Sequence, residues 1–237
     1  MLGYRQLESD LIAAFALERR PVAVSFVDTP PAGVRKFTGA VPSSCTFWKL
    51  AAAGPFYTVP EDHLNCPVGG YTHHVELPQE RARELEDTLG LMSGLGYINM
   101  QEIPQIFRMP EAPRVIVYAP LGDVPVEPDV VLFAAPAARI MLLMEAARSA
   151  GAAADLPLLG RPTCMALPAA LARGAVASSG CIGNRTYTDI GEGELYCALP
   201  GKSLERVAGE AAIIRRANAA LAEHHQARRE ALTSSGV

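Results

Sequence analysis

The most constraining feature of this 237-residue chain is a pair of matching segments that hold four of its five cysteines. In the first segment, Cys45 precedes an alanine-rich run and Cys66 follows it. In the second, Cys164 and Cys181 flank another alanine-rich run in the same way, and each second cysteine is soon followed by glycine. A chain built like this can bring four thiols together near a pseudo-two-fold axis. The cysteines therefore constrain both the fold and the function.

Apolar stretches on both sides of the cysteine pairs extend the match. Residues 21–26 and 128–133 precede the first cysteine of each pair, and residues 102–110 resemble residues 194–200 after the second. Runs rich in β-branched and aromatic residues favour strands, so the order strand, cysteine, helix, cysteine, strand is expected twice. Because strands alternate with helices, we predict an α/β or α+β fold: a single domain built from two degenerate strand-helix-strand repeats, with a long C-terminal helix.

Hydrophobic periodicity and turn residues predict the boundaries of these parts. The predicted parts are one domain over residues 1–232, repeat one at about 20–120, repeat two at about 127–202, a C-terminal helix at about 203–231 and a disordered tail at 233–237. Within them, helices are expected over 7–17, 43–54, 78–92, 137–150 and 163–174, and strands over 22–27, 114–118, 130–134 and 195–199. The helix over 78–92 has no counterpart in the second repeat and is interpreted as an insertion.

Composition narrows the classes of function. Apolar residues make up 49% of the chain, and the formal net charge of -4 provides no basic surface for nucleic acid or anionic lipid. No apolar run approaches the roughly 20 residues of a membrane-spanning helix, and the amino terminus lacks a signal-peptide profile. We therefore expect a cytoplasmic protein that meets a small molecule or a redox partner protein, with no nucleic acid and no membrane, and that can form a homo-oligomer. Paired cysteines in a reducing cytosol more often bind metal or perform redox chemistry than form structural disulfides.

The first cysteine of each pair is expected in the first turn of a helix. Ser43 or Ser44 can cap the helix that holds Cys45, and Thr163 can cap the helix that holds Cys164. Unpaired backbone N–H groups and the helix dipole stabilise negative charge in such a turn. This position favours the thiolate, which is the form needed for metal ligation or nucleophilic attack.

The second cysteines are followed by turns of small residues, in which backbone amides can approach a bulky anion closely. These turns contain the predicted cofactor-binding residues Gly69, Gly70, Gly183, Asn184 and Arg185. The arginine can neutralise a cluster or hold an anionic substrate. Such surroundings suit the net negative charge of a 4Fe–4S cluster held by four thiolates. We therefore predict an iron–sulfur protein, for electron transfer or redox chemistry on a small substrate, with the metal ligands Cys45, Cys66, Cys164 and Cys181.

Two other interpretations stay open. Phe47, Trp48 and Phe56 can line an apolar pocket, which would make the chain a small-molecule or tetrapyrrole-binding module without catalysis. Alternatively, Cys45 or Cys164 can act together with His73 as a thiol redox enzyme or a cysteine nucleophile.

Histidines near the first pair offer a further ligand set. His63 and His73 flank Cys66, and the three residues together could serve zinc or haem. His73 and His74 are expected in a strand, where neighbouring side chains point to opposite faces, so only one of them can contribute. Cys197, the fifth cysteine, lies in a strand-like stretch and is expected to be a small buried core residue.

Several of these segments resemble the domain of unknown function 169 family. The similarity runs from the opening helix to the final one. It is carried by Pro21-Val22-Ala23-Val24, Cys45 with its alanine-rich helix, Arg161-Pro162-Thr163-Cys164 and, most specifically, Gly180-Cys181-Ile182-Gly183-Asn184-Arg185. The resemblance implies a soluble prokaryotic protein with recurring cysteines and implies no particular reaction. The pair His73-His74 departs from the family pattern.

Overall fold

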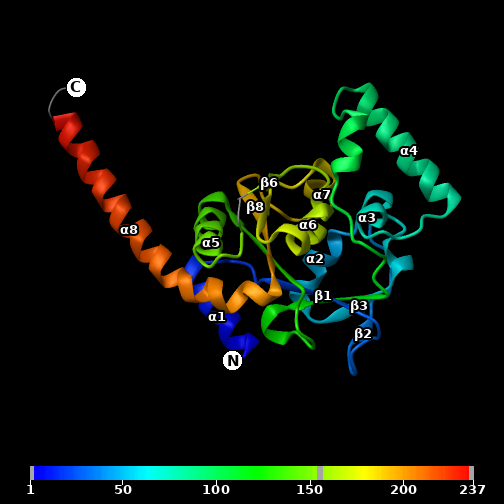
Figure 1. The fold of residues 1–237 in the computed structure, drawn as a ribbon, viewed down its shortest axis with the longest axis horizontal. Helices are drawn as coiled ribbons and strands as arrows, with labels where there is room; N and C mark the ends of the chain where they lie inside the picture. The colour runs from blue at the N-terminus through cyan, green and yellow to red at the C-terminus, as the bar shows by residue number, and fades with distance from the viewer. Residues whose placement is uncertain (1–2, 154–156, 235–237) are drawn as a thin grey trace.

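A computed structural model describes residues 3–153 and 157–234 of the chain (Figure 1). Its centre is a single eight-stranded sheet with strand order β2-β3-β4-β1-β5-β8-β7-β6. The strands are β1 Val22–Val27, β2 Arg35–Lys36, β3 Phe56–Thr58, β4 Val115–Pro120, β5 Val130–Pro136, β6 Leu158–Leu159, β7 Val176–Ser178 and β8 Glu194–Pro200. The sheet spans both cysteine segments, so the two halves of the chain share one scaffold.

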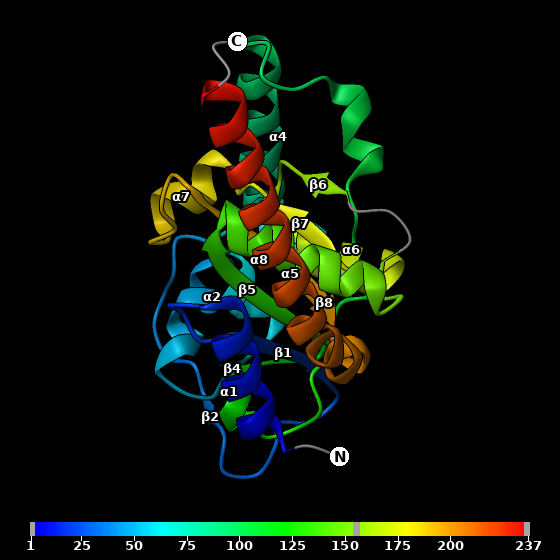
Figure 2. The same cartoon turned by 90° about the vertical axis from the view of Figure 1, so that its left-hand side faces the viewer.

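Helices cover both faces of this sheet (Figure 2). The α-helices are α1 Tyr4–Phe15, α2 Thr46–Leu50, α3 Pro67–Thr72, α4 Gln79–Gly94, α5 Ala137–Ser149, α6 Ala166–Arg173, α7 Ile182–Tyr187 and α8 Leu204–Ser234. Short 3-10 turns are η1 Ala51–Ala53, η2 Pro60–His63, η3 Met100–Gln105, η4 Leu121–Asp123, η5 Thr163–Met165 and η6 Gly201–Ser203. The mixed α/β fold and the long C-terminal helix are therefore as predicted.

The two halves of the sheet have the same strand order when read outward from its middle. β1 and β5 are antiparallel neighbours at the centre, followed outward by β4, β3 and β2 on one side and by β8, β7 and β6 on the other. In each half the outermost pair is parallel and the remaining pairs are antiparallel. This order places the first and second cysteines of each segment in related positions. The interpretation of the sequence as two degenerate repeats stays a prediction.

The sheet separates two hydrophobic cores, because side chains alternate between its faces. α1, α5 and the first turns of α8 cover the face that we call the back face, where Val131 and Phe133 of β5 are buried. α2 and α6 cover the opposite face, together with Val130 and Leu132. Cys45 and Cys164 lie in this second core, so we call it the thiol face. Burying each large apolar side chain contributes about 1.5–3 kcal/mol.

Cys197 of β8 points to the back face and is fully buried, 3.3 Å from the sulfur of Met144. Burial raises the pKa of this thiol far above its ordinary value. The expectation of a buried core cysteine is confirmed, and the sheet separates Cys197 from the two cysteines of the thiol-face core.

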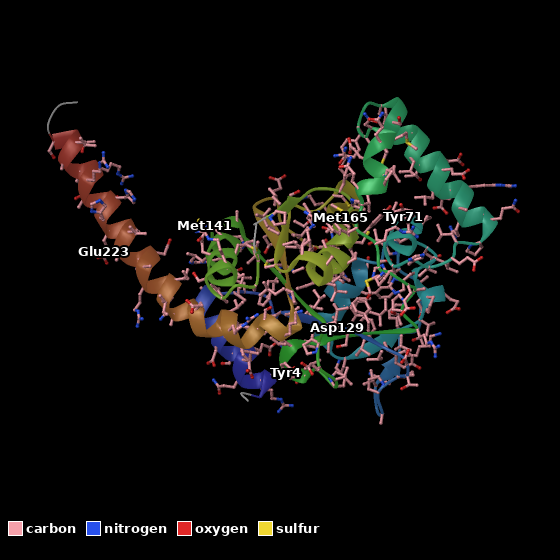
Figure 3. The ribbon with its side chains drawn as sticks, viewed as in Figure 1. Tyr4, Tyr71, Asp129, Met141, Met165 and Glu223 are labelled. Atoms are coloured by element: carbon pink, nitrogen blue, oxygen red, sulfur yellow. The ribbon has the colours of Figure 1, made fainter. Side chains whose placement is uncertain are left out.

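Two helices project from opposite sides of the body (Figure 1). α4 has no buried residue, and α8 buries only Leu204, Val207 and Ala211 near its start. Glu223 lies on the projecting part of α8 (Figure 3). Within the described residues, no helix is both long enough and apolar enough to cross a bilayer.

Several sequence-based boundaries need correction. Residues 102–110 begin in η3 rather than in a strand, and β4 closes the first half of the sheet instead. Pro104 removes a backbone N–H that a strand ladder would use. The predicted tail at 233–237 begins too early, because α8 continues to Ser234; the rest of that tail lies outside the described residues.

Candidate functional site

Cys66 and Cys181 occupy the same position in their halves, at the N-cap of a six-residue helix. The sulfur of Cys66 accepts a hydrogen bond from the backbone N–H of Gly69 at 3.3 Å, and the sulfur of Cys181 accepts one from Asn184 at 3.4 Å. The sequence predicted loose turns at these places. The segments are helical instead, because each sulfur satisfies a backbone donor that a first turn leaves free.

Direct contacts tie the four cysteine segments together. A Cβ on Gly69 would lie 2.8 Å from the Cβ of Ser44 and 3.0 Å from the sulfur of Cys66, so the residue before Cys45 adjoins Cys66. The sulfur of Cys164 lies 3.9 Å from the carbonyl oxygen of Val68, one residue before Gly69.

The second half supplies the remaining link. The backbone N–H of Cys181 donates to the hydroxyl of Thr163 at 2.5 Å, next to Cys164. Helix α3 packs against the turn that contains Cys164, and Met165 of that turn and Tyr71 of α3 lie in the same region (Figure 3). We call Cys45, Cys66, Cys164 and Cys181 the thiol site; all four thiols are free.

Cys45 and Cys164 are the two buried cysteines of this site, whereas Cys66 and Cys181 are partly exposed. The S–H of Cys45 donates to the sulfur of Cys164, which raises the pKa of Cys45 and lowers that of Cys164. Burial and the negative charge of Cys66 and Cys181 raise the pKa of Cys45 further. Cys164 is therefore the thiol of this pair that loses its proton first, while Cys45 keeps its proton unless a cation compensates the charge.

For Cys66, as for Cys164, burial and hydrogen bonding shift the pKa of the thiol in opposite directions. Burial raises the pKa of its thiol to about 11, followed by the charge of Cys164. The backbone N–H groups of Ser44 and Gly69 and the Ser44 hydroxyl act in the other direction, since they favour the thiolate. The site thus places donors around a sulfur that burial alone keeps protonated.

A buried chain of side chains continues from Ser44. Its hydroxyl lies 3.0 Å from Nδ1 of His63, and Nε2 of His63 lies 3.0 Å from the hydroxyl of Thr58. With the Ser44 proton directed to Cys66, Nδ1–H of His63 donates to Ser44 and the Thr58 hydroxyl donates to Nε2. Each donor then points along the chain toward Cys66. Burial and, after it, the neighbouring His73 lower the pKa of His63 well below its ordinary value.

His73 is completely buried at the end of α3. Its Nδ1–H donates to the carbonyl oxygen of Gly69 at 2.8 Å. Nε2 therefore has a free lone pair, for which the described residues supply no hydrogen-bond donor. Its ring lies 5.0 Å from that of His63, and burial lowers its pKa. The structure therefore connects His63, rather than His73, to Cys66. The expected strand at His73 and His74 is wrong, because His73 ends a helix and His74 follows with φ 59°.

In the second half, an amide and a phenol take the place of the imidazoles. Asn184 is buried and donates from Nδ2 to the hydroxyl of Tyr196 at 3.3 Å. Arg185 donates to the carbonyl oxygens of Ser179, Gly191 and Glu194. Its guanidinium therefore holds the backbone around Cys181, and its predicted contact with a cluster or an anionic substrate stays a prediction.

The other predicted residues have distinct surroundings. Gly70 packs against the side chain of Leu77, and a Cβ on Gly183 would meet nothing closer than Tyr187 at 3.9 Å. The expected capping by Ser43, Ser44 and Thr163 is wrong: Cys45 is itself the N-cap of α2, and no side chain caps α2 or η5. The hydroxyl of Ser44 bonds to His63 and that of Thr163 accepts from Cys181, since tertiary partners compete with local capping.

Within residues 3–153 and 157–234, no group of three or more His, Cys, Asp or Glu side chains is placed to hold a metal ion. Cys66, His63 and His73 thus do not form the zinc or haem set considered from the sequence. A zinc ion needs its thiolates to converge at about 2.3 Å from one point. In a 4Fe–4S cluster each thiolate binds a different iron, so the sulfurs stand apart by the width of the cluster. The same finding covers Cys45, Cys66, Cys164 and Cys181 among the described residues, so the cluster expected from the sequence stays a prediction.

Sequence reasoning missed Thr58, Tyr196 and the bridging role of Ser44. Thr58 and Tyr196 lie in strands whose pattern indicates only structure, so no local signal singles them out. Ser44 adjoins Cys45 in the sequence, but its contact with Cys66 depends on the packing of α3 against the thiol face.

Comparison with protein families gives a match to the model of DUF169, described as uncharacterised ArCR, over residues 10–210. Comparison with curated proteins and with solved structures finds no match. The matched range runs from α1 into α8 and includes all four cysteines of the thiol site. The chain therefore belongs to the DUF169 family.

Proposed function

We propose that this chain is a cytoplasmic protein that binds an iron–sulfur cluster through Cys45, Cys66, Cys164 and Cys181. The cluster would serve electron transfer or redox chemistry on a small molecule. The observation that carries the proposal is the gathering of four free cysteines from both halves of the sheet, two of them with backbone N–H groups directed at their sulfurs.

The surroundings of the sulfurs support this proposal. Iron–sulfur clusters are held by thiolates, and hydrogen bonds to the sulfurs and burial tune their reduction potential. Gly69 and Asn184 supply such bonds to Cys66 and Cys181, and Cys45 and Cys164 are buried. Such a cluster accepts and releases electrons one at a time without a change of ligands.

The proton balance of the site also favours a bound cation. Burial keeps Cys66 protonated at neutral pH, and four thiolates in one apolar region would repel one another. Iron would displace the thiol protons and compensate the charge, so loading should release protons and stabilise the folded chain.

Single Cys→Ala variants of the four cysteines test the ligand set. Each should lose most of the iron found in the wild-type protein after anaerobic purification. Cys197→Ala is the matched control, because Cys197 is buried in the opposite core. The Cys197→Ala protein should keep the iron content of the wild-type protein. Full iron content in Cys66→Ala or Cys164→Ala would refute the four-ligand assignment.

A second candidate function rests on the pair Cys45 and Cys164. Their sulfurs share a hydrogen bond, and the pKa of one is lowered while that of the other is raised, as in a dithiol in which one member attacks first. This pair could form a disulfide reversibly with an external thiol–disulfide couple. Mass spectrometry of the metal-free protein after oxidation tests this second function. A Cys45–Cys164 disulfide that forms and is reduced again supports it, whereas five free thiols after oxidation exclude it.

A further inference from the structure

A cavity of about 330 Å³ is lined by Trp48 of α2 and by residues of the loops that precede β1 and β8. We call it the Trp48 cavity. Its apolar lining is Val22, Trp48, Ala52, Leu132, Phe133, Ala134, Ile190 and Tyr196, and its charged lining is Glu18, Arg19, Arg20, Lys49 and Asp189. Small-ligand sites are typically apolar concavities of about 300–1,000 Å³ with a few polar groups, so this volume suits a ligand of one or two rings.

Two of the residues that line this cavity, Trp48 and Tyr196, have aromatic rings. Trp48 and Tyr196 are almost fully buried and meet edge to face, with ring centroids 5.4 Å apart. Trp48 is one turn after Cys45, and its backbone N–H donates to the Cys45 carbonyl oxygen. The Tyr196 hydroxyl accepts from the side chain of Asn184, whose backbone N–H donates to the sulfur of Cys181. The two rings are thus connected to one cysteine of each half.

Ion pairs of two lining arginines connect the segments that border the cavity. Arg19 bonds to the carboxylates of Asp189 and Glu194 and to the carbonyl oxygen of Asp189, which ties the loop before β1 to the loop before β8. Arg20 bonds to Glu8 and Asp123 on the other side.

The charges around the cavity indicate the sign of the ligand. Its lining has three cations and two carboxylates, and Arg19 and Arg20 are engaged in the ion pairs just described. Lys49 stands outside those pairs. Burial raises the pKa of Asp189, but Arg19 and, more weakly, the charge of Lys49 act against burial, and the pKa ends below its ordinary value. An ammonium beside aromatic rings matches a flat ligand with one carboxylate. Glu18 is the lining carboxylate outside those pairs, so a cationic ligand is the competing outcome.

We propose that the Trp48 cavity binds a small planar aromatic carboxylate, whose ring lies against Trp48 and Tyr196 and whose carboxylate pairs with Lys49. The binding itself needs no cluster. The assignment of this ligand as the small molecule on which the thiol site acts rests on the proposed function.

The chain offers a built-in reporter, because Trp48 is its only tryptophan. Titration of the full-length protein with para-nitrobenzoate, followed by calorimetry and by tryptophan fluorescence, should show saturable binding that quenches Trp48. The neutral para-nitrobenzamide should bind about tenfold more weakly, since it lacks the charge that pairs with the exposed ammonium of Lys49. Lys49→Met should weaken para-nitrobenzoate binding about tenfold as well, and Lys49→Arg should restore most of it.

Lys202→Met is the control, because this exposed lysine does not line the cavity. Equal binding of the amide and the carboxylate, unchanged binding by Lys49→Met, tighter binding of para-nitrobenzylamine or no quenching would each overturn the proposal. The iron content of the same samples separates the two proposals. Iron-loaded protein that does not bind para-nitrobenzoate refutes the cavity assignment alone, and iron-free protein that binds it refutes the cluster alone.

Discussion

The two halves of the sheet hold their second cysteines by the same backbone contact and support them with different side chains. Cys66 and Cys181 each cap a six-residue helix, with N–H to sulfur distances of 3.3 Å and 3.4 Å. Behind Cys66 lies a buried hydroxyl–imidazole chain, whereas Asn184 and the phenol of Tyr196 lie behind Cys181. Because both halves use this backbone hydrogen bond, we infer that both need the sulfur at the start of the short helix. The different supports give each sulfur its own electrostatic surroundings.

The largest difference in stability between the two halves should appear when one glycine of each short helix, Gly69 in α3 or Gly183 in α7, is replaced by alanine. A Cβ on Gly69 would press on the Ser44 side chain and lie 3.0 Å from the sulfur of Cys66, whereas a Cβ on Gly183 meets no atom within 3.4 Å. Gly69→Ala should therefore lower the free energy of unfolding by about 2–3 kcal/mol. Gly183→Ala should be neutral or stabilising by up to about 1 kcal/mol, because alanine favours helix. Urea unfolding of both variants measures the difference, and equal stability would mean that α3 is not tightly packed against Ser44.

The next effect concerns the hydrogen bonds behind each cysteine. His63→Leu leaves the buried hydroxyls of Ser44 and Thr58 without their shared partner, which should cost about 2 kcal/mol of unfolding free energy. Tyr196→Phe removes one acceptor from Asn184 and should cost only about 1 kcal/mol. The same urea titrations apply. A smaller loss for His63→Leu than for Tyr196→Phe would show that the imidazole chain is not the stronger support.

A smaller effect should appear in the dependence of stability on pH. Burial lowers the pKa values of His63 and His73, so the unfolded chain takes up protons more readily than the folded chain as the pH falls. The stability of the neutral histidines is fully present above about pH 6.5 and is lost below it, by up to about 1.4 kcal/mol per pH unit for each histidine. Unfolding at about pH 7.5 and about pH 5.5 measures this loss, since carboxylates titrate mainly near pH 4.

The double variant His63→Gln/His73→Gln is the control for this pH effect. It should be less stable than the wild-type protein at neutral pH, yet show a flatter dependence between the two pH values. An unchanged slope would place the responsible groups outside the first half.

How much of this comparison could be predicted depends on the range of the interactions involved. The strand at 22–27 and the helix near 78–92 were predicted closely, because their residues have strong local preferences for strand and helix. Helices α3 and α7 were predicted as turns, since six residues with glycine have little helix propensity without the cysteine cap. The four cysteines were found from their spacing.

The supports of the cysteines lie beyond sequence reasoning of this kind. Thr58, His63 and Ser44 meet only because β3, η2 and the segment before α2 pack together. The Trp48 cavity likewise depends on Arg19, which joins two loops that are distant in the sequence. Such contacts leave no periodic pattern, so the environment of each sulfur has to be read from the structure.

The central claim is that the thiol site holds an iron–sulfur cluster, and the most direct measurement is the iron and acid-labile sulfide content of anaerobically purified wild-type protein, with its visible spectrum. We expect a brown protein that contains iron and sulfide in similar amounts. A protein with iron and no sulfide would contradict the claim, because its iron would not belong to a cluster. A colourless protein without iron would also contradict it and would leave the Cys45–Cys164 dithiol as the chemistry of the site.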